Sequence, residues 1–420
     1  MSKKRILSLV LAMAMTVSLF AGCGGSSSSS AAAEGDSSAA ADGSSTAAAS
    51  GETIKIGYVS DLTGTSRLWG TAGRDGALLA VEDVNAAGGV LDGQMIELIA
   101  SDGKGEPADS VNAYRSMVEN DGIVASIGTN FSNCNIAMAP VAEQLQVPII
   151  GTATSNSLVT MDEEGNLRPY SFRMCFLDSF QGTALGLKAA QLGFKKGAMI
   201  RTIDDTYSME VGQYIMDTFV EQGGEIVASE TVNVSDTDFR AQLTNIAAAN
   251  PDVLFIPCTY NNVALIAKQA KEMGINCVYM GTDSWDSAEL AELAGGALEG
   301  SYYVSRIGFN SPEAKEFGER YQSVYNVDLE AECLFGYSGV MWVVDAIERA
   351  GSAEPSAIRD ALENTDTFSS LIGTLVQDPA THNPSMDVAV FQCTDGVFNY
   401  VETMSANDIQ AAIPEVTAEA

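Results

Sequence analysis

From Thr53 onward, short apolar runs alternate with amphipathic stretches, and this alternation is the strongest constraint on the fold. The runs at 53–60, 95–101 and 123–128 have the length of strands, and each gap between them contains a helical stretch of roughly 10–15 residues. A strand that follows a crossover helix pairs in parallel with its neighbours. The pattern therefore predicts an α/β protein built on parallel sheets.

The same pattern begins again in the second half of the chain. Strands are expected at 197–203, 225–232, 252–257 and 277–281, with helices between them. Further helices are expected at 312–324, 331–350 and 355–364, and β-like runs at 372–377, 388–393 and 397–401. Two copies of a doubly wound parallel layer, finished by a small hairpin, predict two lobes that face a cleft.

Residues 1–23 do not follow this pattern of strands and helices. Three basic residues at 3–5 precede an apolar stretch at 6–22 that is too short for a spanning helix, so 1–22 is interpreted as a cleaved signal peptide. The run 19–23 resembles the bacterial lipoprotein signal, which implies that Cys23 is lipidated. An ordinary secretory signal with a coincidental cysteine is the alternative.

Residues 23–50 are almost wholly Gly, Ser and Ala after the cysteine. Such a segment cannot bury enough apolar surface to offset its ordering entropy. We therefore expect a flexible linker that holds the folded part away from a membrane anchor.

Charge excludes one class of partner. Asp and Glu number 55 against 22 Lys and Arg, giving a formal net charge of −33, and no basic stripe offsets it. A surface this acidic repels phosphate backbones, so nucleic-acid binding is excluded.

Catalytic and metal-binding patterns are also missing from the sequence. The single histidine, His382, rules out sites built on several histidines, and it is expected in an exposed turn. There is no dinucleotide or phosphate-binding glycine loop, and the segment 336–339 fails as a nucleophile elbow, which leaves Ser338 as a polar residue entering a helix. The six cysteines after Cys23 show no metal spacing and are expected to be mostly buried thiols. We therefore expect neither an enzyme, nor a metal, nor a cofactor.

Five loops that follow predicted strands are polar or aromatic, and in open parallel sheets ligands bind beside such loops. They lie at 65–70, 129–133, 151–155, 204–207 and 281–285. Hydroxyls and free N–H groups at helix starts suit a carboxylate, whereas an isolated acid across the cleft suits an ammonium group. The loops together predict a receptor for a zwitterion such as an α-amino acid.

Each loop residue also has a purely structural interpretation. Ser132, Thr154 and Ser155 could be helix N-caps, and Asp283 could cap the helix that follows it. Trp69 could be a packing residue. Their shared position on strand-to-helix loops favours binding for the set as a whole.

Short motifs in a fixed order extend this interpretation from Ile54 to about Tyr400. They are 56–59 with 62–64, Gly70 with Gly73 and Ala77, 86–90, 101–102, 121–123, Pro148 with 153–155, 172–173, 267–270 with Gly274, and 280–281. In these motifs the chain resembles the type I periplasmic binding proteins of the leucine/isoleucine/valine-binding family, which are solute receptors of branched-chain amino-acid ABC importers.

This resemblance implies roles for residues in the first half of the chain. Ser132 matches the serine that receives the ligand carboxylate, and Ala153 and Ser155 match backbone and hydroxyl contacts to the same end. Thr154 lies between them in the same loop. Trp69 takes the place of an aromatic residue near the ligand side chain.

For the second half, the resemblance implies that Asp283 pairs with the α-ammonium group and that Tyr207 is an aromatic contact. Thr259 stands where the family usually has a tyrosine, with Tyr260 next to it, so this wall of the pocket departs from the pattern.

The resemblance further implies two lobes joined by a three-strand hinge, with crossings near Arg173, near Val304 and after Ile372. The expected lobes are 53–173 plus 305–373 and 174–304 plus 374–410. A lipid-anchored, monomeric receptor outside the cytoplasm would close over an amino acid, a branched-chain type first, and present it to a membrane permease. The alternative is a ligand-sensing module of the same fold, for an amide, an aromatic amino acid or another small acid, which signals through a partner.

Overall fold

The computed structural model describes residues 53–287, 289–306 and 312–414. The predicted signal peptide, the linker and Cys23 lie outside these residues. Among the described helices, none is long and apolar enough to cross a membrane.

The first sheet is all parallel, with the strand order β2-β1-β3-β4-β5. Its strands are β1 (Ile54–Ser60), β2 (Ile96–Asp102), β3 (Ala125–Ile127), β4 (Ile149–Gly151) and β5 (Ser171–Arg173). The helices of this half are α1 (Arg67–Ala86), α2 (Pro107–Ser116), which continues as a π-helical turn (Met117–Asp121), and α3 (Ser132–Leu145). A 3-10 turn (Ser157–Val159) precedes β5.

The second sheet is mixed, with the order β14-β13-β10-β9-β8-β6-β7. The parallel part contains β6 (Lys196–Thr202), β7 (Glu225–Val232), β8 (Val253–Phe255), β9 (Val278–Gly281) and β10 (Tyr302–Ser305). The antiparallel hairpin β13 (Val388–Thr394) and β14 (Val397–Met404) completes it, as the sequence predicts. Its helices are α4 (Asp178–Gln191), α5 (Thr206–Glu221), α6 (Arg240–Ala249), α7 (Tyr260–Glu272), α8 (Leu290–Ala294) and α12 (Ala406–Gln410), with a 3-10 turn at Asp283–Trp285.

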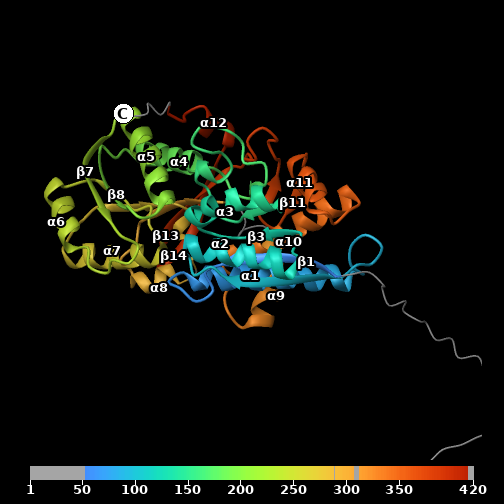
Figure 1. The fold of residues 1–420 in the computed structure, drawn as a ribbon. Coiled ribbons are helices and arrows are strands. Elements are labelled where there is room, and N and C mark those ends of the chain that lie inside the picture. The colour runs from blue at the N-terminus through green and yellow to red at the C-terminus, as the bar shows by residue number, and fades with distance from the viewer. Residues whose placement is uncertain (1–52, 288, 307–311, 415–420) are drawn as a thin grey trace, which may run out of the picture. The chain divides into compact units, whose positions relative to one another are not determined.

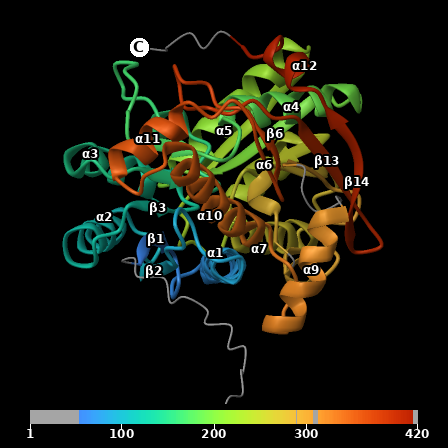
Figure 2. The same ribbon diagram turned by 90° about the vertical axis from the view of Figure 1, so that its right-hand side faces the viewer.

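Three late helices return to the first sheet. They are α9 (Pro312–Tyr325), α10 (Ala331–Ala350) and α11 (Pro355–Glu363), followed by the small ribbon β11 (Phe368–Ser370) and β12 (Gly373–Leu375). Phe317 and Trp342 share one buried cluster with Ile56 of β1, and α10 packs beside α1 (Figures 1 and 2). The opposite face of the same sheet buries Tyr114 and Met138 from α2 and α3.

The second sheet is also covered on both faces, by two separate buried clusters. Phe219 and Phe255 lie in the cluster that includes α4 and α5, whereas Ile266 and Leu254 lie in the cluster that includes α6 and α7. Both sheets are therefore doubly wound, which confirms the predicted fold class. The chain passes between them after β5, after β10 and after β12, the three places where the hinge is expected.

Two local predictions are wrong. His382 is fully buried, because its ring stacks on Phe172 with centroids 4.1 Å apart and its Nδ1 lies 2.9 Å from the carbonyl oxygen of Ser171. Burial lowers the pKa of this histidine. Ser338 does not enter a helix but lies buried in the middle of α10.

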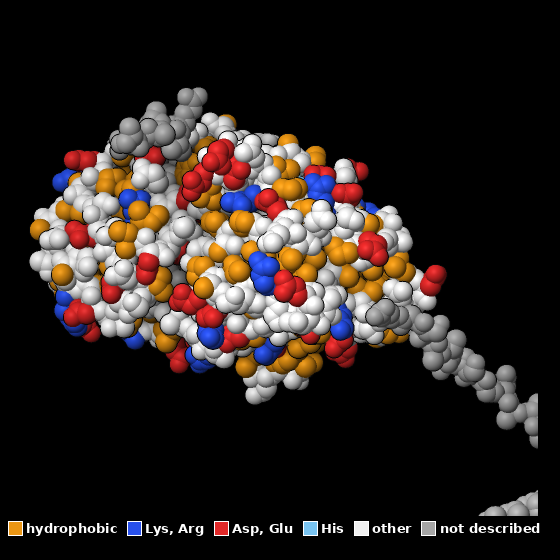
Figure 3. Space-filling view, in the orientation of Figure 1, with side chains coloured by type: hydrophobic (Ala, Val, Ile, Leu, Met, Phe, Trp, Pro, Cys, Tyr) orange, Lys and Arg blue, Asp and Glu red, His pale blue; other side chains and the backbone are white. Residues whose placement is uncertain are grey.

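The distribution of charged side chains on the surface agrees with the absence of a basic stripe in the sequence. On the face shown in Figure 3, acidic and basic side chains are scattered among each other, and no basic stripe is visible. The six described cysteines are free, and five of them are buried, as expected.

Candidate functional site: a cavity between the two sheets

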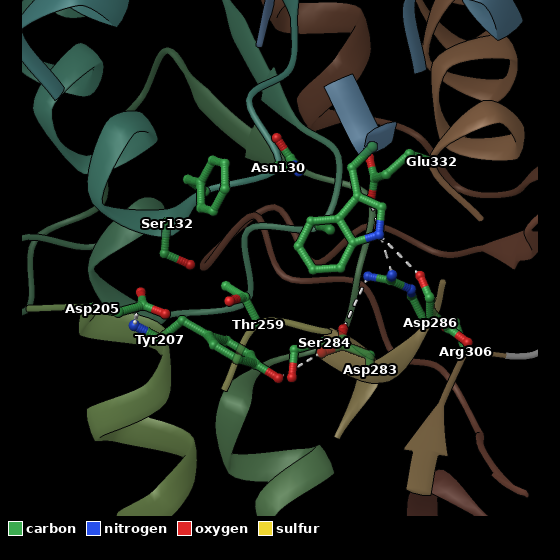
Figure 4. Close-up of a pocket in the computed structure, with 13 residues that line it drawn as sticks. Asn130, Ser132, Asp205, Tyr207, Thr259, Asp283, Ser284, Asp286, Arg306 and Glu332 are labelled. Atoms are coloured by element: carbon green, nitrogen blue, oxygen red, sulfur yellow. Dashed lines mark hydrogen bonds and ion pairs between the residues drawn. The ribbon is translucent and has the colours of Figure 1, made fainter. Parts of the chain in front are cut away.

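Loops from both sheets enclose a cavity with about 480 Å³ of space between atoms, including open solvent (Figure 4). The lining residues are Trp69, Asn130, Phe131, Ser132, Ala153, Asp205, Tyr207, Thr259, Asp283, Ser284, Asp286, Arg306 and Glu332.

Most of these residues follow a parallel strand directly. Asn130–Ser132 follow β3, Ala153 follows β4, Asp205–Tyr207 follow β6, and Asp283–Ser284 follow β9. Because the carboxyl ends of parallel strands share one edge of each sheet, these loops meet where the two sheets face each other. Glu332 is the second residue of α10 and comes from the first lobe.

The Ser132 side of the cavity suits an anion. Ser132 opens α3, a 14-residue helix whose first backbone N–H groups point out of its N-terminus. Its hydroxyl accepts a hydrogen bond from the backbone of Asn156 at 3.3 Å, which fixes the loop after β4 beside it. Ala153 of that loop lines the cavity. A carboxylate placed here would meet a hydroxyl and backbone donors.

The opposite side suits a cation. Tyr207 donates its hydroxyl proton to Asp283 Oδ1 at 2.7 Å, and the same hydroxyl lies 2.5 Å from Thr282 Oγ1. Burial and the nearby carboxylate of Asp283 raise the pKa of Tyr207 well above its usual value, so the phenol stays protonated. Asp283 is 6% exposed and lies at the cavity wall.

Asp283 already has one charged neighbour, Arg306, which the sequence did not indicate. Arg306 Nη1 lies 3.0 Å from Asp283 Oδ2, and Nη2 lies 4.0 Å from Glu332 Oε1. The guanidinium also covers the ring of Phe335 at 4.3 Å. Burial alone would lower the pKa of Arg306, but Asp283 and Glu332 raise it above its usual value, so it is permanently charged.

Three other acids of the cavity are harder to ionise than usual. Burial raises the pKa of Glu332 to about 7, although Arg306 acts in the opposite direction. Burial likewise raises the pKa of Asp286 and of Asp205 to about 6. Asp286 accepts a hydrogen bond from Tyr303 at 2.7 Å, and Asp205 accepts one from the backbone of Tyr207 at the start of α5.

Trp69 connects the two lobes. It belongs to α1 in the first lobe, yet its Nε1 donates to the carbonyl oxygen of Asp286 at 3.0 Å and its ring lies 4.8 Å from that of Tyr260. Both partners belong to the second lobe. The residue therefore lines the cavity and packs against the other lobe at the same time.

Six of the nine predicted binding residues line the cavity: Trp69, Ser132, Ala153, Tyr207, Thr259 and Asp283. The other three, Thr154, Ser155 and Tyr260, stand behind it.

Two of the residues behind the wall, Thr154 and Ser155, hydrogen-bond to other parts of the protein, although the buried Thr154 Oγ1 itself has no hydrogen-bond partner. The Ser155 hydroxyl accepts a hydrogen bond from Gln181 Nε2 at 3.3 Å, and the Thr154 carbonyl accepts one from Arg173 at 3.0 Å. Gln181 also accepts a hydrogen bond from the backbone of Asp283 at 3.3 Å, so this side chain connects the loop after β4 with the loop after β9. Thr154 and Ser155 therefore position the wall, and Tyr260 supports Trp69.

Seven lining residues are absent from the prediction: Asn130, Phe131, Asp205, Ser284, Asp286, Arg306 and Glu332. The first four belong to loops that the sequence singles out, so their loops, but not their side chains, could be predicted. Arg306 and Glu332 follow a hinge strand and open a late helix, and no local motif marks them. Among the described residues, no group of acids, histidines and cysteines has the arrangement of a metal site.

Comparisons with known proteins agree on one family. A model of the family described as periplasmic binding protein matches residues 53–397. The Leu/Ile/Val-binding protein homolog 2 of Brucella abortus is 28% identical over 360 residues, which cover 83% of this chain and 93% of the relative. A leucine-binding protein of Thermotoga maritima has 30% identity and a TM-score of 0.77, with 85% of this chain and 100% of that chain covered. A branched-chain amino acid transporter substrate-binding protein of Streptococcus pneumoniae, solved with isoleucine, has 29% identity and a TM-score of 0.74, with 84% and 99% covered.

Proposed function

The chain belongs to the periplasmic binding protein family, and on that premise we propose that it is the extracytoplasmic solute receptor of an ABC importer, not an enzyme, and that it binds an α-amino acid in the cavity between its lobes. The names of its relatives make leucine, isoleucine and valine the reference ligands to test first. A membrane permease is the partner that would receive the ligand.

The observation that carries this proposal is the opposition of two kinds of group across one cavity. Ser132 and the N-terminus of α3 lie on the first lobe, whereas Asp283 and Tyr207 lie on the second. An α-carboxylate fits the former and an α-ammonium group fits the latter. A zwitterion that contacts both lobes stabilises their closed arrangement, which is how periplasmic binding proteins respond to ligand.

The test is a thermal-shift screen of the purified full chain against the twenty amino acids, followed by calorimetry of every hit. Asp283→Asn is expected to weaken binding by roughly 30-fold or more, because it leaves the buried ligand ammonium without its carboxylate. Asp204→Asn is the matched control, since Asp204 is exposed and does not line the cavity. If Asp283→Asn binds as tightly as the wild type, this role of Asp283 is wrong.

We further propose that residues 1–22 are a signal peptide, that Cys23 is lipidated and that 23–50 tether a monomeric receptor to the outer face of the cell membrane. The basic start, the apolar stretch and the Gly/Ser/Ala run support this. Mass spectrometry of the mature N-terminus tests it, and Cys23→Ser is expected to move the protein from the membrane fraction to the soluble fraction. An unmodified Cys23 in the mature protein contradicts the anchor.

A further inference from the structure

One end of the cavity contains buried polar atoms with unmet hydrogen bonds. Within the described part of the chain, Arg306 Nε, Glu332 Oε2 and Asn130 Nδ2 have no hydrogen-bond partner. Arg306 and Glu332 are only 6% and 4% exposed, and all three residues line the cavity (Figure 4). Buried polar atoms in native proteins nearly always have a partner, so an unmet group in a cavity indicates what the cavity binds.

The other buried polar atoms of the wall without a hydrogen bond, Asp283 Oδ2 and Arg306 Nη1, form an ion pair with each other at 3.0 Å, and the hydroxyl groups have partners in the protein. Thr259 donates its hydroxyl to Asn262 at 2.7 Å, and the Ser284 hydroxyl lies 3.2 Å from that of Thr282. Tyr207 has its partners in Thr282 and Asp283. The unmet groups of Arg306 and Glu332 lie together beside Asp283, since Arg306 Nη2 is 4.0 Å from Glu332 Oε1, and Asn130 adds a third unmet group from the loop after β3.

The mixture of charges at this end disfavours three kinds of ligand side chain. An apolar side chain would leave Arg306 Nε, Glu332 Oε2 and Asn130 Nδ2 buried and unpaired. A cationic side chain would be repelled by the permanently charged guanidinium of Arg306. An anionic side chain would face Glu332 and Asp286, which line the same end. A neutral group that both donates and accepts hydrogen bonds avoids all three problems.

We propose that this end of the cavity recognises a ligand carrying a carboxamide side chain. A carboxamide has one oxygen that accepts two hydrogen bonds and an NH₂ group that donates two. Its oxygen matches the two donors, Arg306 Nε and Asn130 Nδ2, and its NH₂ group matches Glu332 Oε2. This proposal rests on the proposed function as an amino-acid receptor and names the side-chain class. It departs from the apolar side chains in the names of the relatives.

The experiment compares three amino acids of nearly equal size by calorimetry on the full chain. Leucine, asparagine and aspartate share the same branching at the γ position, but that position carries methyl groups, an amide or a carboxylate. Asparagine, or the longer glutamine, is expected to bind at least 10-fold more tightly than leucine and aspartate. The same comparison is then made for Glu332→Met and Glu332→Gln, with circular dichroism to establish that each variant is folded.

Glu332→Met replaces the acceptor with an apolar chain of similar length and is expected to shift the ratio of leucine to asparagine affinity by at least 10-fold towards leucine. Glu332→Gln keeps an acceptor oxygen and is expected to retain the preference for the amide. Ser132→Ala is the control, because it acts at the carboxylate end that all amino acids share and should weaken them equally.

The outcomes separate this proposal from the function on which it rests. If leucine binds more tightly than both amides, and Glu332→Met leaves the ratio unchanged, the carboxamide proposal is wrong and the amino-acid receptor stands. Should no amino acid bind while benzoate does, Arg306 is the partner of a simple carboxylate, and both proposals fall.

Discussion

At the scale of single residues, the cavity is organised around one cation. Arg306 reaches Asp283 of the second lobe and Glu332 of the first, so a guanidinium at the hinge connects acids from both. Removing one member of such a buried set is costly, because the remaining charges lose compensation without regaining water. The charge state of Glu332 should therefore be visible in the stability of the whole protein.

Glu332 is expected to make the free energy of unfolding fall as the pH rises. Its pKa is about 7 in the folded protein against 4.5 as its ordinary value, so between these values the folded chain binds the proton that the unfolded chain releases. The stabilisation is fully present below pH 4.5, and it is lost as the pH passes 7. The full effect is about 3 kcal/mol, and urea unfolding at pH 5 and pH 8 measures it.

Glu332→Gln provides the control for this pH dependence. His382, whose pKa is lowered by burial, changes stability in the opposite direction as the pH falls below its ordinary value of 6.5, so only the difference between the two proteins isolates Glu332. The wild type should lose stability relative to Glu332→Gln between pH 5 and pH 8. A constant difference across this range contradicts the buried, titrating Glu332.

The same residues mark the limit of what the sequence could predict. Ser132, Tyr207 and Asp283 lie on loops that follow strands, and strand ends can be located from the alternation of patterns. Arg306 directly follows the hinge strand β10 and Glu332 opens a later helix, so no local pattern brings them together, and Glu332 looks like any acid in the first turn of a helix. Their proximity is a property of the tertiary fold.

At the scale of elements, the packing of α1 against α10 depends on glycine. A Cβ added at Gly336 would lie 1.8 Å from the carbonyl oxygen of Gly73, and one added at Gly76 would lie 2.0 Å from that of Cys333. The atoms met are backbone, which cannot move aside as a flexible side chain can. These contacts explain the segment 336–339 better than catalysis does: Gly336 lets two helices approach closely, and Gly339 lies against Ile127 of β3.

Gly336→Ala is accordingly expected to destabilise the protein by about 3 kcal/mol or more, as overpacking against a rigid neighbour does. The matched control is Gly212→Ala in α5, where the added Cβ would meet only side-chain atoms, the nearest being Arg201 Cδ at 3.1 Å. That change should be neutral or stabilise by up to about 1 kcal/mol, because alanine favours helix. Urea unfolding of both variants measures the difference, and equal effects would show that the helix contact is looser than described.

The positions of helices and strands were easier to predict than the burial of individual side chains. Strands and helices follow from apolar periodicity, and their types agree with the structure, although α1 has 20 residues instead of the roughly 10–15 expected. The burial of His382 had no local cue, since its partners Phe172 and Ser171 are far away in the sequence. A polar turn was a reasonable expectation for Thr-His-Asn-Pro, and tertiary stacking overrode it.

At the scale of the whole folded unit, function requires that the two lobes close and reopen. In this structure, contacts already join them: Trp69 donates to Asp286, and Asn261 donates to the carbonyl oxygen of Thr65 at 3.0 Å. In each pair, one residue belongs to the first lobe and the other belongs to the second. The arrangement described here is therefore a closed one, and its stability without ligand depends on how much such contacts contribute.

Trp69→Ala is expected to shift the ligand-free protein towards an open arrangement, since it removes both the ring contact with Tyr260 and the hydrogen bond to Asp286. Small-angle X-ray scattering should show a larger radius of gyration without ligand, and a radius close to that of the wild type at saturation. Affinity should fall by roughly 10-fold or more, because ligand must then supply the free energy of closure. Leu78→Ala is the control on the same helix, since Leu78 is 40% exposed and does not line the cavity. If Trp69→Ala changes affinity but leaves the radius of the free protein unchanged, Trp69 acts only as a wall of the cavity and not as a contact that holds the lobes together.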